Sequence, residues 1–155
     1  MGRNKIFKII CLLFLLSSCC TPILQKKFYT TEYGSNRPKK NKFKLSKKQN
    51  ELNDLQLESI YISKNKETFY RFFKNGKVLI SGINPNLKEK EQFNNLRSGK
   101  IGYYKLKKNL VLFEYFSVGA HDCGEYHQYQ KKMIGDSIVG YQKIKVEGLT
   151  GTPDW

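Results

Sequence analysis

The residues best suited to chemistry gather in a stretch of eight, 120–127, with the sequence AHDCGEYH. Three of them are side chains that zinc accepts as ligands, with a fourth position open in catalytic sites. These are His121, Cys123 and His127. The alternative is a polar hairpin loop in which Gly119 and Gly124 make the turn and Asp122 accepts hydrogen bonds from backbone amides. Because no Cys-x-x-Cys or His-Glu-x-x-His pattern accompanies these residues, we favour the loop over a zinc site or a cysteine nucleophile with a histidine base.

A second polar group is expected where strands pair on both sides of this loop. Symmetric pairing across the loop puts Glu114 opposite Tyr129, with His127 two residues away on the same face. The preceding hairpin brings Tyr103 opposite Glu114 as well. A glutamate between two tyrosines and near a histidine would suit a ligand site inside a barrel, since such sites are mostly apolar with a few placed polar groups. In the alternative, Glu114 faces solvent and pairs with a lysine, and a shift of one residue in the pairing would reverse the facing.

The elements that must position these residues are β-strands. Asn75-Gly76 lies between residues 67–74 and 77–81, both rich in β-forming side chains. An Asn-Gly pair in this setting is the strongest short hairpin signal, because both central positions of a type I′ turn need a positive φ. A further strand is expected before this hairpin, at residues 57–62.

More strands follow a break at residues 84–99, which we interpret as a long loop or a short helix. They are residues 101–106, 110–118, 125–133 and 137–146, with Gly135-Asp136 suited to a type II′ turn. The result is an all-β domain, an up-and-down antiparallel meander of about seven strands. Strands that are apolar on both faces favour closure into a small barrel, which also removes exposed edges.

Length and composition limit the class of protein. The chain has 155 residues, and its 28 lysines and arginines against 13 acidic residues give a net charge of +15. This length allows one small domain and excludes a multi-domain enzyme. A basic chain raises the question of nucleic acid, but no zinc-finger or RNA-binding motif is present, so nucleic acid is not an expected partner.

The chain begins in the manner of a secretory signal peptide. Basic residues Arg3, Lys5 and Lys8 precede the apolar run 9–16, which is followed by two serines. The run is shorter than the roughly 20 apolar residues that a membrane-spanning helix needs. We therefore expect residues 1–18 to be a helical leader that is removed after export.

Leu16-Ser17-Ser18-Cys19 resembles the lipobox of bacterial lipoproteins. The resemblance implies that the Cys19 thiol receives a diacylglycerol, that the chain is cut before this residue, and that acyl chains such as palmitate hold the protein to a membrane of the cell envelope. Cys20 is a second candidate, with a poorer fit because Ser17 stands three places before it. Since neither an aspartate nor an acidic cluster follows Cys19, the resemblance implies the outer membrane, with the domain facing the periplasm.

Residues 19–50 are expected to form a lipidated, basic and flexible tether before a β-domain at 51–155. Residues 21–50 hold nine basic side chains and one acidic one, Glu32. So many charges with so few apolar residues predict a solvated spacer, which can also lie on anionic lipid headgroups. Because Cys20 would sit at the membrane end of this spacer, we expect Cys123 to stay a free thiol.

Residues 100–142 are similar in texture to the small lipocalin-like barrels of many bacterial lipoproteins, in which Gly-x-Tyr and Gly-Asp pairs separate short strands. The Gly-x-Trp signature of lipocalins is absent. The resemblance implies a lipid-anchored envelope protein that binds a small apolar ligand or an envelope component without catalysis and without a cofactor. The alternatives are a structural or assembly lipoprotein that binds another envelope protein and, third, the zinc site above.

Overall fold

The computed structural model describes residues 27–31, 35–47, 59–97, 99–119 and 122–153. The expected signal peptide, the lipobox and Cys19 fall in residues 1–26, outside the described residues. Within the described residues, no helix is long and apolar enough to cross a membrane.

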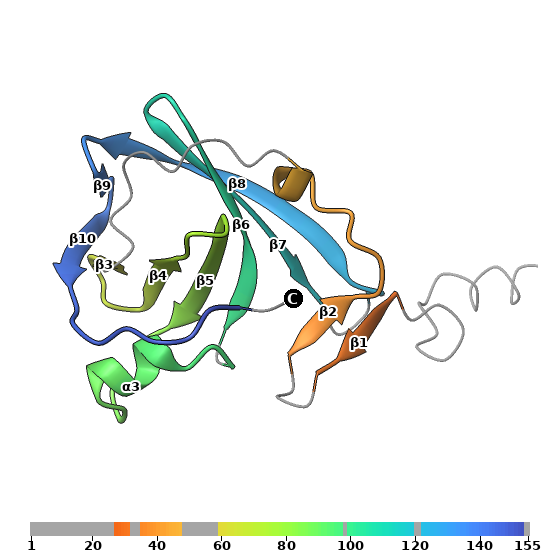
Figure 1. Cartoon of the computed structure of the whole chain (residues 1–155), viewed down its shortest axis with the longest axis horizontal. Helices are drawn as coiled ribbons and strands as arrows, with labels where there is room; N and C mark the ends of the chain where they lie inside the picture. Colours follow the sequence, from red (N-terminus) through yellow and green to blue (C-terminus); the bar gives the residue numbers. More distant parts are fainter. Residues whose placement is uncertain (1–26, 32–34, 48–58, 98, 120–121, 154–155) are drawn as a thin grey trace, which may run out of the picture.

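One antiparallel sheet of eight strands forms the body of the protein, in the order β10-β3-β4-β5-β6-β7-β8-β9. Its strands are β3 (Ser59–Ser63), β4 (Thr68–Phe72), β5 (Lys77–Gly82), β6 (Lys100–Lys107), β7 (Leu110–Ser117), β8 (Glu125–Ile134), β9 (Ser137–Ile138) and β10 (Tyr141–Lys145). The sheet curls until its two end strands, β9 and β10, meet across the short turn that joins them, in a nearly closed barrel (Figure 1). The predicted all-β antiparallel barrel is confirmed. The expected last strand, 137–146, is divided at Gly140, whose φ is 87°, and this division adds a strand to the predicted seven.

The smaller elements lie outside the barrel. They are β1 (Phe28–Thr30), β2 (Asn36–Pro38), the 3-10 turn η1 (Leu45–Lys47) and the helix α3 (Glu89–Asn94). Strands β1 and β2 form a separate two-stranded sheet. The helix lies in the break predicted at 84–99.

The β4–β5 hairpin forms where it was predicted, but its turn differs. Only Gly76 has a left-handed φ, 72°, whereas a type I′ turn requires it at Asn75 too. The Phe73 amide donates to the Lys77 carbonyl at 2.9 Å and the Gly76 amide to the Phe73 carbonyl at 3.1 Å, which is the pattern of a three-residue loop. In this longer loop the Asn75 side-chain nitrogen Nδ2 donates to the Pro153 carbonyl at 3.3 Å. No local sequence pattern predicts this contact.

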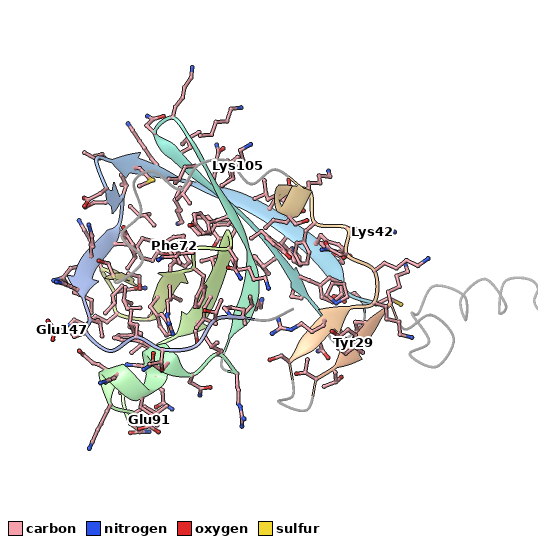
Figure 2. The ribbon with its side chains drawn as sticks, viewed as in Figure 1. Tyr29, Lys42, Phe72, Glu91, Lys105 and Glu147 are labelled. Atoms are coloured by element: carbon pink, nitrogen blue, oxygen red, sulfur yellow. The ribbon has the colours of Figure 1, made fainter. Side chains whose placement is uncertain are left out.

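Aromatic side chains fill the inside of the barrel. The inner core comprises Tyr61, Tyr70, Phe72, Val78, Tyr104, Val111, Phe113, Met133 and Ile138. Phe72 meets the rings of Tyr61, Tyr104 and Phe113 at centroid distances of 5.4, 4.7 and 6.0 Å. Figure 2 shows Phe72 within the barrel. Such ring contacts stabilise the fold beyond the apolar area that they bury.

Two covers shield apolar patches on the outside of the barrel. The C-terminal cover is formed by α3 and residues 146–153. Its Phe93 side chain packs with barrel residues in a second core, which also comprises Ile60, Phe69, Phe73, Leu79 and Ile101. The N-terminal cover, residues 35–47, lies over β6, β7 and β8, where the fully buried Phe43 ring contacts Tyr103 at 4.9 Å and Tyr126 at 4.8 Å. This part of the expected flexible tether is thus packed on the barrel, because the strands present aromatic rings that Phe43 can bury against.

Candidate functional site

The four residues of the predicted polar group lie on two different faces of the sheet. Tyr103 pairs with Glu114 as predicted, but Glu114 faces Gln128, and Tyr129 faces Phe113. The β7–β8 pairing is therefore one residue away from the predicted one. Tyr103 and Glu114 consequently lie outside, beneath the N-terminal cover, whereas His127 and Tyr129 belong to the inner face.

The loop before β8 explains the shifted pairing. The Asp122 carboxylate accepts hydrogen bonds from the amides of Gly119 at 2.8 Å and Gly124 at 2.7 Å. Strand β7 ends at Ser117, so Val118, which was predicted to end the strand, belongs to the loop. The polar-loop interpretation of Asp122 is confirmed, and the symmetric pairing is wrong because the loop begins one residue earlier.

The loop gives no support to a metal centre. His121 lies outside the described residues, and within the part of the chain that the structure describes no three histidine, cysteine or acidic side chains form a metal-binding group. Cys123 is disulfide-bonded, so the prediction of a free thiol is wrong. That prediction assumed a tether extended away from the domain, whereas Lys27 and Gly124 line one cavity.

His127 and Tyr129 belong to two separate environments on the inner face. The His127 ring stacks on Tyr115 at 5.1 Å and lines a polar pocket with Lys100 and Asp122. The Tyr129 and Tyr141 hydroxyls donate to the Tyr70 hydroxyl at 3.2 and 2.9 Å. Burial raises the pKa of Tyr129 to about 12 and that of Tyr70 well above its ordinary value, so these phenols stay neutral at physiological pH.

Glu114 fastens the N-terminal cover to the barrel. Its side chain is 1% exposed. One carboxyl oxygen accepts a hydrogen bond from the Leu45 amide at 2.8 Å and the other from the Gln128 side chain at 2.9 Å. Both oxygens are satisfied, so this residue holds the cover in place and is neither exposed to solvent nor part of an interior ligand site.

The N-terminal cover and the start of β8 enclose a cavity of about 340 Å³, which we call the lysine groove. Its lining consists of Lys27, Pro38, Lys39, Lys40, Lys42, Phe116, Gly124 and Tyr126. All four lysines are exposed, and none of these lining residues is acidic. Figure 2 shows Lys42 on the outer side of the cover, beside β8. The groove therefore combines an apolar floor with a positively charged rim.

Hydrogen bonds fix the rim on the floor. The Tyr126 hydroxyl donates to the Lys40 carbonyl at 2.7 Å and accepts from the Lys42 amide at 3.2 Å. The Lys39 amide donates to the Lys27 carbonyl at 2.8 Å. Through these bonds one tyrosine of β8 positions the backbone that carries the lysines, so their charges are displayed over the same apolar surface.

Gly124 shapes the floor. Its φ is 92°, and a Cβ atom there would lie 2.1 Å from the Phe116 ring. Only glycine allows the ring to pack on the backbone at this point. Phe116 in turn contacts Tyr126 at a centroid distance of 5.2 Å, and together the two rings form a continuous apolar surface.

This arrangement suits a ligand with a negatively charged head and an apolar chain. The chain would lie on the rings, and the head would meet the ammonium groups, which are compact charges that bind carboxylate or phosphate without a fixed geometry. Sequence reasoning missed the groove because it assigned the lysines to a spacer. The signal that could have found it is Pro38 and Phe43 within the basic run, since apolar residues there indicate a segment that packs.

No family model, no curated protein and no solved structure matches this chain.

Proposed function

We propose that this chain is a lipid-anchored envelope lipoprotein whose barrel binds an anionic amphiphile, without catalysis, in the lysine groove. The observation that carries the proposal is the groove itself, with four exposed lysines around Phe116, Tyr126 and Pro38. The class of ligand is a fatty acid or lipid with one acyl chain at the site and a carboxylate or phosphate head. The proposed ligand therefore differs from the expected small apolar ligand in that it also carries a negative charge.

The position of the groove along the chain supports a membrane ligand. Lys27 follows Cys19 by eight residues, and an extended chain of that length spans at most about 28 Å. If Cys19 carries acyl chains, the groove lies near the bilayer surface, where each lysine gains about 1 kcal/mol from anionic lipids. The proposed location is the outer membrane, with the barrel in the periplasm.

The anchor is tested by metabolic labelling with palmitate in a bacterial host. The wild-type chain is expected to take up the label, Cys19→Ala to lose it, and Cys20→Ala to keep it. Label that persists in Cys19→Ala would contradict the assignment of the lipid to that residue.

Ligand binding is tested on the full chain purified in a neutral detergent, by quantifying the anionic lipid that co-purifies. We expect near-stoichiometric lipid on the wild type and a loss of at least about tenfold when Lys39, Lys40 and Lys42 are all changed to Glu, because the rim then repels the head. The matched control changes the exposed Lys64, Lys107 and Lys132 to Glu, which alters net charge equally. Equal loss in both variants would contradict a specific groove, and a lipid-free protein with a stable crosslinked partner would favour the assembly alternative.

A further inference from the structure

A buried positive charge lies beneath the C-terminal cover. Arg71 of β4 is 4% exposed. Its Nη1 donates to the Phe93 carbonyl at 3.0 Å and to the Asn94 side chain at 3.2 Å. Its Nη2 donates to the carbonyls of Thr150 at 2.9 Å and Gly151 at 3.2 Å. All four acceptors are neutral, so these bonds hold the C-terminal cover without neutralising the guanidinium.

No carboxylate compensates this charge among the described residues. The guanidinium lies over the Phe73 ring at 4.7 Å, and burial lowers the pKa of Arg71. Its Nε is buried and has no hydrogen-bond partner among the residues that the structure describes. Buried cations in proteins are ordinarily paired, because leaving one unpaired in a poorly polar environment is unfavourable. An anion that settles nearby would supply the missing charge.

A cavity of about 530 Å³ lies beside Arg71, and we call it the arginine cavity. Its wall is made by the end of β4, the following turn and the C-terminal cover. Lys74 and Lys145 line it with Arg71, and among the described residues Glu147 is the one acidic side chain in its lining. Of these residues, three cations against one carboxylate leave an excess of two positive charges, the complement of a doubly charged oxyanion.

We propose that the arginine cavity binds a phosphate group. The phosphate oxygens lie against the Lys74 and Lys145 ammonium groups, within the field of the Arg71 charge. This site is separate from the lysine groove, since the two share no lining residue and lie under different covers. It takes a phosphate without an acyl chain, or the phosphate of a lipid headgroup.

The test is a calorimetric titration of the full chain, held in nanodiscs of neutral phosphatidylcholine, with inorganic phosphate. We expect one saturable site whose affinity falls at least about tenfold in Lys74→Gln/Lys145→Gln, a pair that leaves the Arg71 hydrogen bonds intact. The control pair Lys64→Gln/Lys132→Gln, and the three glutamate substitutions of the lysine groove, are expected to leave the affinity unchanged. Because the groove variants should lose lipid but keep phosphate affinity, a failure of the phosphate site can be told apart from a failure of the proposed lipid binding.

A second titration with soluble short-chain phosphatidate distinguishes the two sources. Tighter binding than inorganic phosphate assigns the site to a lipid headgroup, and equal binding assigns it to a free phosphate. Acetate, with a single charge, is expected to bind at least tenfold more weakly. No saturable phosphate binding, equal weakening by both lysine pairs, or acetate binding as tight as phosphate would each overturn the proposal.

Discussion

The N-terminal and C-terminal covers are both held on the barrel by buried ionisable side chains, but the charges of these side chains are opposite. Each shields an apolar patch on the outside of the barrel. The buried Glu114 side chain holds the first cover, and the buried side chains of Arg71 and Lys77 hold the second, where Lys77 donates to the Pro153 carbonyl at 2.9 Å. Both carboxyl oxygens of Glu114 have donors, whereas the Arg71 charge has no carboxylate and its Nε no acceptor among the described residues. Glu114 thus has its hydrogen-bond partners within the protein, whereas the Arg71 charge can still attract an anion.

The cavities beside the two covers differ in the same way. In the lysine groove the charges stand exposed around an apolar floor, an arrangement for a ligand that is itself divided into head and chain. In the arginine cavity a cation is buried in the wall. An apolar chain is expected in the first and a compact anion in the second.

The largest expected effect comes from Phe43→Ala, which breaks the N-terminal cover. Phe43 is fully buried between Tyr103 and Tyr126, so its removal is expected to lower the free energy of unfolding by about 4 kcal/mol. The urea midpoint of the full chain in neutral detergent and the hydrogen exchange of the Leu45 amide measure it. Tyr29→Ala, at a side chain that is 45% exposed, is the control and should change little. An unchanged midpoint for Phe43→Ala would show that the cover contributes nothing to stability.

Arg71→Met tests the fastening of the C-terminal cover. The change leaves the carbonyls of Phe93, Thr150 and Gly151 without their donor, and we expect a loss of about 3 kcal/mol in the free energy of unfolding. Arg71→Lys, which keeps the charge but only part of the hydrogen bonding, should fall between wild type and Met. If Arg71→Met were more stable than wild type, the cost of burying the Arg71 charge would exceed the stabilisation by its hydrogen bonds. The C-terminal cover would then be held by its other contacts.

A smaller effect is expected for Glu114→Gln. The glutamine keeps one acceptor oxygen and replaces the other with a donor that faces a donor, so we expect a loss of about 1 kcal/mol. The urea midpoint measures the loss, and faster hydrogen exchange at the Leu45 amide should accompany it. If Glu114→Gln were as damaging as Phe43→Ala, the carboxyl would matter more than the apolar contact in holding this cover.

The interior of the barrel should respond to alkaline pH. Burial raises the pKa of Tyr129 and of Tyr104 to about 12, against an ordinary value of 10.0. Between these values the unfolded chain releases protons that the folded chain keeps, so the free energy of unfolding should fall as the pH rises from 10 to 12 and be unaffected near pH 7. The slope of stability against pH should flatten in Tyr104→Phe/Tyr129→Phe. An identical slope in that variant would assign the loss to other groups.

Local patterns predicted the strands well and the contacts between distant segments poorly. The Asn75-Gly76 hairpin and the Tyr103–Glu114 pair follow from neighbouring residues, and the structure contains both. The break was expected to be a long loop or a short helix, and the structure has the short helix α3 there. The predicted β7–β8 pairing was wrong by one residue because β7 ends at Ser117 and not at Val118. That single step moved Glu114 to the face opposite His127.

The two covers could not be predicted from composition. A basic segment with few apolar residues is disordered unless a surface for those residues exists, and for Phe43 that surface comes from Tyr103 and Tyr126, about 60 and 80 residues further along the chain. Arg71 could have indicated the C-terminal cover. It stands among four aromatic residues in the sequence FYRFF, so a cation at this position needs partners from outside its own strand.

The most direct test of the central claim, that the lysine groove holds an anionic amphiphile, is to map a photoactivatable fatty acid onto the full chain in phosphatidylcholine vesicles. We expect crosslinks concentrated on Phe116, Tyr126 and Pro38, and their loss in Gly124→Ala, whose new methyl group displaces the Phe116 ring. Crosslinks spread evenly over the barrel, or unchanged in Gly124→Ala, would contradict the claim.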